Sequence, residues 1–255
     1  MMQKRPWLQK VAVFCAFSLL FPALALACNP AKFIVAVDVG HTVHSPGAVS
    51  ARGIPELQFN RKLANEVLQA LRIAGFTESV LINADGRIAS LSERVRQANQ
   101  AQASLFLSIH HDSVQPHYLG RWRVGGVTRR YSDRFHGYSL FISGDSQHFE
   151  ASRRFAILTG QSLIARGLSP TLHHAEPIPG ENRPLLDLTL GVYRYDDLYV
   201  LRHASMPALL LEAGVIVNRE EEIRLQRPAY WQRIAASVVT AVTDFCNEAD
   251  PMPVD

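Results

Sequence analysis

Apolar residues along the chain alternate between short runs rich in β-branched side chains and longer segments with a helical repeat. Residues 33–40, FIVAVDVG, are typical of a buried strand. Residues 57–73 carry apolar side chains three and four positions apart, which is typical of one helix face. The same patterns predict further strands at 78–84, 104–110, 138–143, 198–202 and 208–214, and further helices at 89–102, 150–166 and 228–246.

Strands that alternate with helices in this way favour an α/β fold, with a mainly parallel sheet covered by helices on both faces. No internal repeat or low-complexity linker divides the chain, so we expect a single domain. Two stretches, 115–136 and 168–196, lack regular periodicity, and segments of this kind in a compact domain are commonly functional loops. Ligands of open α/β sheets bind beyond the carboxyl ends of the strands, so we expect the chemistry there.

The first residues differ from the rest of the chain. Residues 1–27 combine three basic residues, no acid, an apolar run and the small-residue sequence Ala25-Leu26-Ala27. This order predicts a secretory signal peptide over 1–27 and a domain over 28–255 that is periplasmic or secreted. The three basic residues equal the net charge of +3, so the basic balance belongs to the leader and the remaining chain is formally neutral.

Export decides how the cysteines are interpreted. Cys15 lies in the predicted leader, whereas Cys28 and Cys246 remain near the two ends of the domain. Chain ends often lie close together and the compartment is oxidising, so we favour a Cys28–Cys246 disulfide. Lipidation of Cys28 and a pair of free thiols are the alternatives. A lipobox prefers Leu three residues before the cysteine, where this chain has Ala25.

Residue types that bind metals or transfer protons gather at the ends of the predicted strands. They are His41, His110, His111 and Glu212, with Glu56 at the start of the first predicted helix. Two imidazoles and one carboxylate are the donors of a hydrolytic zinc site, whose fourth position holds water. A free carboxylate can then transfer the proton of that water. Each residue also has a structural explanation, such as a hydrogen-bonded histidine, but their joint position favours the site.

Three segments resemble, in order and context, the motifs of the zinc-dependent N-acetylmuramoyl-L-alanine amidases of the Amidase_3 type. They are IVAVDVGHTVHSPGAVSARGIPELQFN, LFLSIHHDS and MPALLLEAGVIVN. The resemblance runs from about residue 33 to 246 and implies a mainly parallel six-stranded sheet. It also implies a peptidoglycan substrate, in which the amide between the lactyl group of N-acetylmuramic acid and L-alanine of the stem peptide is cut. Such a substrate requires export.

The resemblance further implies one zinc ion and assigns its ligands and the catalytic acid/base. The ligands are His41, Glu56 and His110, and the acid/base is Glu212. Adjacent side chains of a strand point to opposite faces, so only one of His110 and His111 should bind, and the motif register selects His110. His44 is a further candidate ligand by position alone.

The chain departs from the family pattern at three places. Thr42 and Val43 stand where two glycines are common, so we expect a stiffer or bulkier loop over the metal. His111 stands where a small residue is usual, and Val215 where an aromatic residue is common. The last change affects packing more than chemistry.

Some cell-separation amidases of this family carry a segment between the second and third motifs that blocks the site until an activator protein binds. The corresponding interval here includes 168–196, with His173, His174, Glu176 and Glu181. We favour a substrate-facing loop. The alternative is a plug in which an acid of the loop caps the open zinc position, which would make an activator protein a second partner. No sequence-specific nucleic-acid motif occurs, and no membrane span remains once the leader is removed.

Two other functions fit the same residues. A zinc peptidase acting on cell-wall peptides would use the same ligands and carboxylate, and the ends it leaves on purified sacculi would distinguish it. A catalytically silent wall-binding protein is the other alternative, although the presence of all four side chains argues against it.

Overall fold

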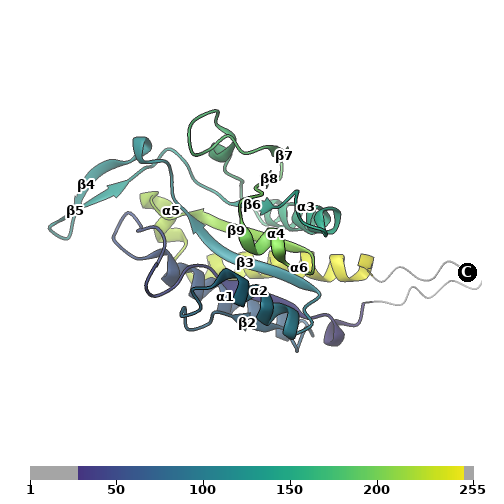
Figure 1. Cartoon of the computed structure of the whole chain (residues 1–255). Helices are drawn as coiled ribbons and strands as arrows, with labels where there is room; N and C mark the ends of the chain where they lie inside the picture. The colour runs from purple at the N-terminus through teal and green to yellow at the C-terminus, as the bar shows by residue number, and fades with distance from the viewer. Residues whose placement is uncertain (1–27, 250–255) are drawn as a thin grey trace, which may run out of the picture.

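The computed structural model describes residues 28–249, and its centre is a seven-stranded sheet (Figure 1). The predicted signal peptide lies outside the described residues. The strands follow the order β2-β1-β3-β9-β6-β8-β7 across the sheet. Their bounds are β1 Val35–Val39, β2 Val80–Ile82, β3 Leu105–Asp112, β6 Ser139–Ile142, β7 Leu185–Asp187, β8 Val192–Arg194 and β9 Ala208–Val215.

The sheet is mainly parallel. β1 pairs in parallel with β2 and with β3, and β3 pairs in parallel with β9. β6 runs antiparallel to β9 and parallel to β8, and β7 is antiparallel to β8. The α/β prediction is therefore confirmed, with seven strands where the resemblance implied six.

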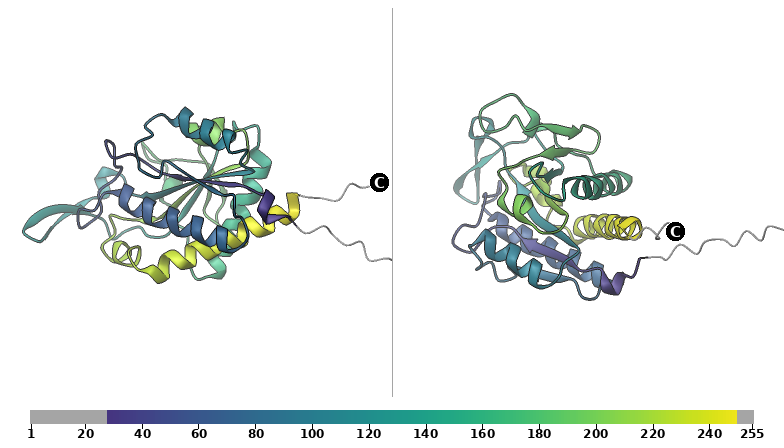
Figure 2. Two further views of the ribbon diagram at one scale, coloured as in Figure 1. Left: turned by 90° about the horizontal axis from the view of Figure 1, so that it is seen from below. Right: turned by 45° about the vertical axis from the view of Figure 1, so that its right-hand side comes forward.

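Helices cover both faces of the sheet (Figure 2). Their bounds are α1 Glu56–Ile73, α2 Leu91–Gln100, α3 Phe149–Ala165, α4 Tyr199–His203, α5 Arg219–Arg224 and α6 Pro228–Ala249. Val35, Val37 and Val39 of β1 pack with α1, α3 and α6 on one face, whereas Ala36 packs with α2 and α4 on the other. Because both faces are covered, the central strands read as continuous apolar runs instead of alternating ones.

One predicted element is wrong: of residues 198–202, predicted to be a strand, 199–202 lie in the short helix α4 and Leu198 caps its start. A five-residue apolar run has no periodicity that separates a buried strand from a turn of buried helix. Val200 and Leu201 fill the space between α2 and the sheet, so tertiary packing decides the conformation.

Both segments predicted to be irregular contain strands. Within 115–136, β4 (Gly120–Val124) and β5 (Val127–Tyr131) form an antiparallel hairpin that projects from the body (Figure 1). Its turn is Gly125-Gly126, both with positive φ, as a tight two-residue hairpin turn requires. Within 168–196 lie the 3-10 helix η3 (His173–Ala175), β7 and β8. These strands are too short or too rich in arginine to give an apolar alternation.

The two ends of the described chain are joined. Cys28 and Cys246 form a disulfide with a Cα–Cα distance of 5.4 Å, as the favoured interpretation of the cysteines expected. Between residues 28 and 249, no helix has both the length and the apolar character that crossing a membrane requires.

Candidate active site

Neighbouring strands bring His110 and Glu212 together. The two residues are direct partners in the parallel register of β3 and β9, so their side chains lie on the same face of the sheet. Gly40, which follows β1, leaves room for the His110 ring, since a Cβ there would lie 2.3 Å from His110 Nε2. The absence of a side chain at residue 40 is therefore a condition for this position of His110.

The backbone of His41 has an unusual conformation, which two distant side chains stabilise. Its φ is 68°, in the left-handed region that a residue with a Cβ seldom adopts. Its carbonyl accepts hydrogen bonds from Asn83 Nδ2 at 2.7 Å and from Arg94 at 2.8 Å. Both donors also bind the carbonyl of Val39, so two side chains from distant segments fix the turn that presents the imidazole.

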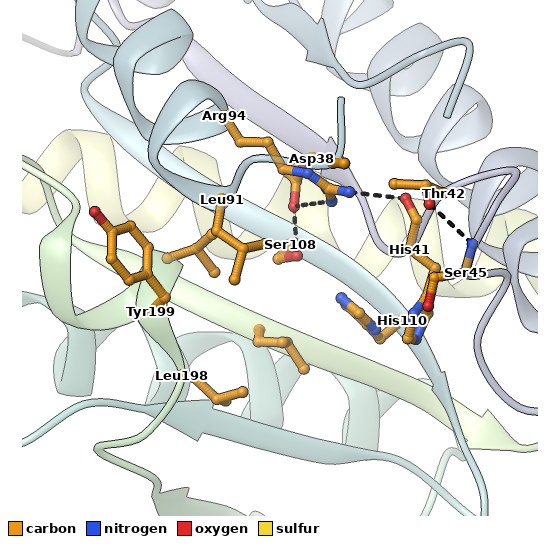
Figure 3. A pocket seen from close by; sticks show the side chains of 13 residues that line it. Asp38, His41, Thr42, Ser45, Leu91, Arg94, Ser108, His110, Leu198 and Tyr199 are labelled. Atoms are coloured by element: carbon orange, nitrogen blue, oxygen red, sulfur yellow. Dashed lines mark hydrogen bonds and ion pairs between the residues drawn. The ribbon is translucent and has the colours of Figure 1, made fainter. Parts of the chain in front are cut away.

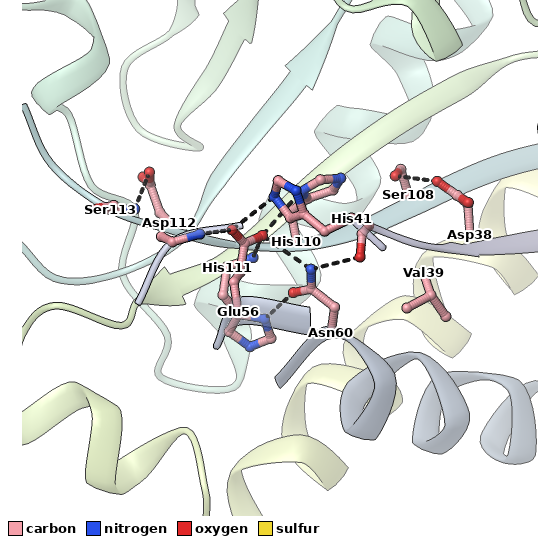
Figure 4. A network of polar contacts seen from close by, with 12 residues as sticks. Asp38, Val39, His41, Glu56, Asn60, Ser108, His110, His111, Asp112 and Ser113 are labelled. Atoms are coloured by element: carbon pink, nitrogen blue, oxygen red, sulfur yellow. Dashed lines mark hydrogen bonds and ion pairs between the residues drawn. The ribbon is translucent and has the colours of Figure 1, made fainter. Parts of the chain in front are cut away.

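Glu56 completes the group from the first turn of α1 (Figure 4). His41 Nε2 lies 2.8 Å from Glu56 Oε2, and His110 Nδ1 lies 3.1 Å from Glu56 Oε1. One ligand atom from each of the three residues lies within 4.8 Å of the others. Gly47 has φ 78°, and a Cβ there would meet Glu56 Oε2 at 2.3 Å, so the loop between His41 and α1 also depends on a glycine.

The charge of the group suits a divalent cation. Burial opposes ionisation of Glu56, but the contacts from His110 and His41 hold the pKa of this carboxyl below its usual range. Two imidazole nitrogens and an ionised carboxylate are donors that zinc accepts. The residues present therefore fit a metal ion.

Glu212 differs from Glu56 because its Oε2 is buried and has no hydrogen-bond partner among the described residues. Burial, and after it the nearby carboxylates of Asp112 and Glu56, raise the pKa of Glu212 well above its usual range. A carboxyl group whose pKa is raised in this way is a candidate for proton transfer.

The two histidines of the pair occupy different environments. His111 points away from His41 and Glu56, and its Nδ1 lies 2.8 Å from Asn60 Oδ1 on α1 (Figure 4). Burial lowers the pKa of His111 to about 3, so this residue is a neutral core histidine. His44 is exposed and lies outside the group of three ligand-type residues.

Two cavities open beside this group. One, of about 260 Å³, is lined by His41, His110 and Glu212 together with Arg183 and Tyr195. The other, of about 380 Å³, has the two histidines in its wall as well and extends towards α2 and α4 (Figure 3). A molecule bound in either cavity would contact the metal-ligand types directly.

A buried polar network supports the histidines and was missed by the sequence analysis. Arg94 Nη1 lies 3.3 Å from Asp38 Oδ1, and Ser108 donates a hydrogen bond of 2.8 Å to Asp38 Oδ2 (Figure 3). Asn60 donates to Glu56 Oε1 at 3.0 Å, which holds the carboxylate that faces both histidines. The one available signal was Asp38, a charged residue inside an apolar run, which must find a partner when buried.

Comparison with known proteins agrees with this geometry. The model of the Amidase_3 family, described as N-acetylmuramoyl-L-alanine amidase, matches residues 35–244. The chain belongs to this family. It is 26% identical to the N-acetylmuramoyl-L-alanine amidase AmiA of Escherichia coli K12, over 86% of this chain and 78% of AmiA. It is also 26% identical to the uncharacterized protein YqiI of Bacillus subtilis 168, over 92% of this chain and 95% of YqiI.

Solved structures of the family share the fold. The catalytic domain of CwlV, an N-acetylmuramoyl-L-alanine amidase from Bacillus (Paenibacillus) polymyxa var. colistinus, superposes with a TM-score of 0.62 at 26% identity. It covers 84% of this chain and 97% of that one. Ami1 from Mycobacterium smegmatis gives a TM-score of 0.67 at 20% identity, covering 86% of this chain and 99% of Ami1. The family resemblance of the three motifs is thus confirmed over nearly the whole described chain.

The two glutamates of the segment 168–196, Glu176 and Glu181, already form hydrogen bonds with other protein groups. Glu181 lines the smaller cavity, but its Oε2 lies 2.8 Å from His174 Nδ1 and its Oε1 accepts from Gln115 at 2.9 Å. Glu176 accepts a hydrogen bond of 2.7 Å from the Tyr118 hydroxyl. Both oxygens of Glu181 therefore contact protein groups other than His41, Glu56 and His110.

Proposed function

We propose that the chain is an exported zinc amidase that hydrolyses the amide between N-acetylmuramic acid and L-alanine of the peptidoglycan stem. One zinc ion would be bound by His41, Glu56 and His110, and Glu212 would be the acid/base. The observation that carries this proposal is the convergence of the three ligand types beside a carboxyl whose Oε2 has no hydrogen-bond partner within residues 28–249. Family membership supplies the substrate class.

The role of Glu212 follows from its environment. When bound, zinc would polarise the scissile carbonyl and lower the pKa of a water molecule. Glu212 accepts the proton of the attacking water at Oε2 and passes it to the alanine nitrogen as the amide bond breaks. The products are the free lactyl carboxylate and a stem peptide with an amino terminus, so the acid/base returns to its starting state.

The wall opposite the metal group would bind the stem peptide. Arg183 lines the smaller cavity, and its guanidinium carbon lies 3.5 Å from the centre of the Tyr195 ring. The hydrogen bond from this guanidinium to the Gly180 carbonyl is long, at 3.3 Å. A cation held flat in this way suits a carboxylate of the stem peptide.

The segment 168–196 is proposed to be a wall of this cleft. The contacts of Glu176 and Glu181 with protein groups support that role over a plug. The plug, and with it an activator protein as partner, stays a prediction that substitution of Glu181 tests.

Removal and return of metal tests the proposal. Purified protein incubated with sacculi should release stem peptides, lose that activity after chelation, and regain it when Zn²⁺ is added back. Activity that survives complete removal of metal would contradict the proposed role of the three ligands.

A further inference from the structure

A second group of metal-ligand types lies next to the candidate active site. Asp112 ends β3 two residues after His110, and His173 and His174 form the start of η3. One ligand atom from each lies within 4.8 Å of the other two. We call these three residues the Asp112 cluster. Their side chains are only 10%, 1% and 10% exposed, so the cluster is largely shielded from water.

Contacts at Nδ1 fix the orientation of the two histidines of the Asp112 cluster. His174 Nδ1 lies 2.8 Å from Glu181 Oε2, and His173 Nδ1 lies 2.9 Å from Thr171 Oγ1. An Nδ1–H that donates to such an oxygen leaves Nε2 as the nitrogen with a free lone pair. Metal-binding histidines are held in the same way, with the remote nitrogen hydrogen-bonded to an oxygen acceptor.

The Nε2 atoms of both histidines converge on one oxygen. His174 Nε2 lies 2.8 Å and His173 Nε2 lies 3.3 Å from Asp112 Oδ2. The Nε2 of His173 is buried and makes no hydrogen bond to any described residue. An unpaired polar atom in this position is costly, and a proton shared between His174 and Asp112 leaves it unpaired. A cation between the three atoms would satisfy all of them.

The candidate active site provides an internal comparison. There too, two imidazoles and one carboxylate approach each other, with nitrogen-to-oxygen distances of 2.8 and 3.1 Å. The Asp112 cluster repeats this donor set at 2.8 and 3.3 Å. Two histidines and a carboxylate select zinc-like divalent ions over magnesium or calcium, which prefer oxygen donors.

We propose that the Asp112 cluster binds a second divalent transition-metal ion, of the kind zinc represents. The ion would connect the segment 168–196, through His173 and His174, to the strand that carries His110. It would hold in place the wall formed by Glu181 and His174, which line the same cavity as His41, His110 and Glu212. This proposal concerns metal content and does not depend on the substrate assigned above.

A protonated His174 between Asp112 and Glu181 is the competing explanation. Burial opposes this charge, but Asp112 and Glu181 outweigh it and raise the pKa of His174 to about 9 in the absence of a metal. A metal ion must displace this proton, so the affinity of the Asp112 cluster for the ion should rise with pH. The two explanations differ in the number of metal ions that each chain holds.

The test is zinc stoichiometry. Purified protein is stripped with a chelator, reloaded with Zn²⁺ at pH 8, freed of excess metal and analysed by inductively coupled plasma mass spectrometry. We expect about two zinc ions per chain, about one in His174→Gln and in His41→Ala, and about none in the double variant. His203→Gln, an exposed histidine on α4, is the matched control and should keep about two. One ion in the unmodified protein, or no loss in His174→Gln, overturns the proposal.

Crystals of the unmodified protein give a second readout, in case His174→Gln fails to fold. Anomalous scattering at the zinc edge from Zn²⁺-loaded crystals should show a peak between Asp112, His173 and His174, besides one between His41, Glu56 and His110. A peak between His41, Glu56 and His110 without one in the Asp112 cluster would overturn the proposal while leaving the amidase site intact.

Discussion

At the scale of single residues, Glu212 is the acid of the site whose Oε2 has no competing partner. Glu56 contacts two histidines and Asn60, whereas Oε2 of Glu212 is buried without a hydrogen bond among the described residues. This difference separates the proposed ligand from the proposed acid/base, although both are glutamates. It follows from their positions, since Glu56 lies on α1 and Glu212 faces the cavity from β9.

Substitution of Glu212 tests this division. Glu212→Gln keeps the shape of the side chain but cannot accept the proton of water, so kcat for stem-peptide release should fall about 10²- to 10⁴-fold. Zinc content should stay unchanged, whereas His41→Ala should lose one metal ion. A Glu212→Gln protein with near-normal release from sacculi would show that another group is the acid/base.

Glu221 permits a test of electrostatics away from the chemistry. Its buried carboxyl accepts hydrogen bonds from the backbone of Gly137 and Val215, and burial raises its pKa from the usual 4.5 to about 7. The folded protein thus binds this proton more tightly than the unfolded chain does, so stability should fall as pH rises from about 4.5 to about 7 and then level off.

Denaturant unfolding at pH 5 and pH 8 measures this effect. Relative to Glu221→Gln, which cannot ionise, the unmodified protein should lose about 2–3 kcal/mol of unfolding free energy between these two pH values. A constant difference between the two proteins across this range would mean that Glu221 titrates in the folded state as it does in the unfolded chain.

The candidate ligands could be predicted from the sequence because each stands at the end of a strand or the start of a helix. The side chains that hold these ligands in position could not be predicted. Asn83 and Arg94 reach the carbonyl of His41 from 42 and 53 residues away, and no local pattern marks such contacts. The side chains proposed to carry out the chemistry could thus be named from the sequence, whereas those that fix their geometry required the fold.

At the scale of elements, the strands and long helices were predictable from periodicity, and the short ones were not. α4 is a helix because Val200 and Leu201 pack beneath α2, although their sequence run favours a strand. β8 has only three residues but is part of the sheet, with Tyr193 fully buried. The segment 168–196 therefore belongs to the fold, and deleting it should unfold the protein instead of freeing the site.

A point substitution tests the plug more cleanly than a deletion. If Glu181 capped the metal, Glu181→Gln would raise basal activity without an activator. We expect no increase in activity, because Oε2 of Glu181 contacts His174 and Oε1 accepts a hydrogen bond from Gln115. Glu176→Gln, whose contacts are with Tyr118 and Arg134, is the matched control. A rise confined to Glu181→Gln would establish the plug.

The same wall should set substrate affinity. Arg183→Ala should raise KM for stem-bearing fragments about 10-fold or more with a smaller effect on kcat, because a charge-assisted hydrogen bond is lost. Arg123→Ala, an exposed arginine of the β4–β5 hairpin, should leave both constants unchanged. An unchanged KM in Arg183→Ala would remove this residue from the binding surface.

At the scale of the whole molecule, one disulfide closes almost the entire described chain. Cys28 and Cys246 are 218 residues apart, so their link restricts the unfolded chain strongly. The double variant Cys28→Ser/Cys246→Ser should lose about 2–5 kcal/mol of unfolding free energy. A reductant should have a similar effect on the unmodified protein and none on the variant. Equal stability with and without reductant would contradict a structural role for the disulfide.

The pairing of the termini was predictable only through the argument for export, since no local pattern specifies which cysteines meet. The formal neutrality of the chain after residue 27 likewise has a consequence at this scale. If the leader is removed as predicted, we expect binding to the wall to rest on the cleft and on local charges such as Arg183, and not on a general attraction between a basic protein and an anionic polymer.

The most direct test of the whole account is the chemistry of the ends left on peptidoglycan. Purified sacculi are digested with the zinc-loaded protein, and the soluble products are analysed by mass spectrometry. We predict intact stem peptides with a free amino-terminal L-alanine, together with glycan strands whose lactyl groups carry free carboxylates. Shortened stems that remain attached to the glycan would show a peptidase and contradict the assignment of the scissile bond.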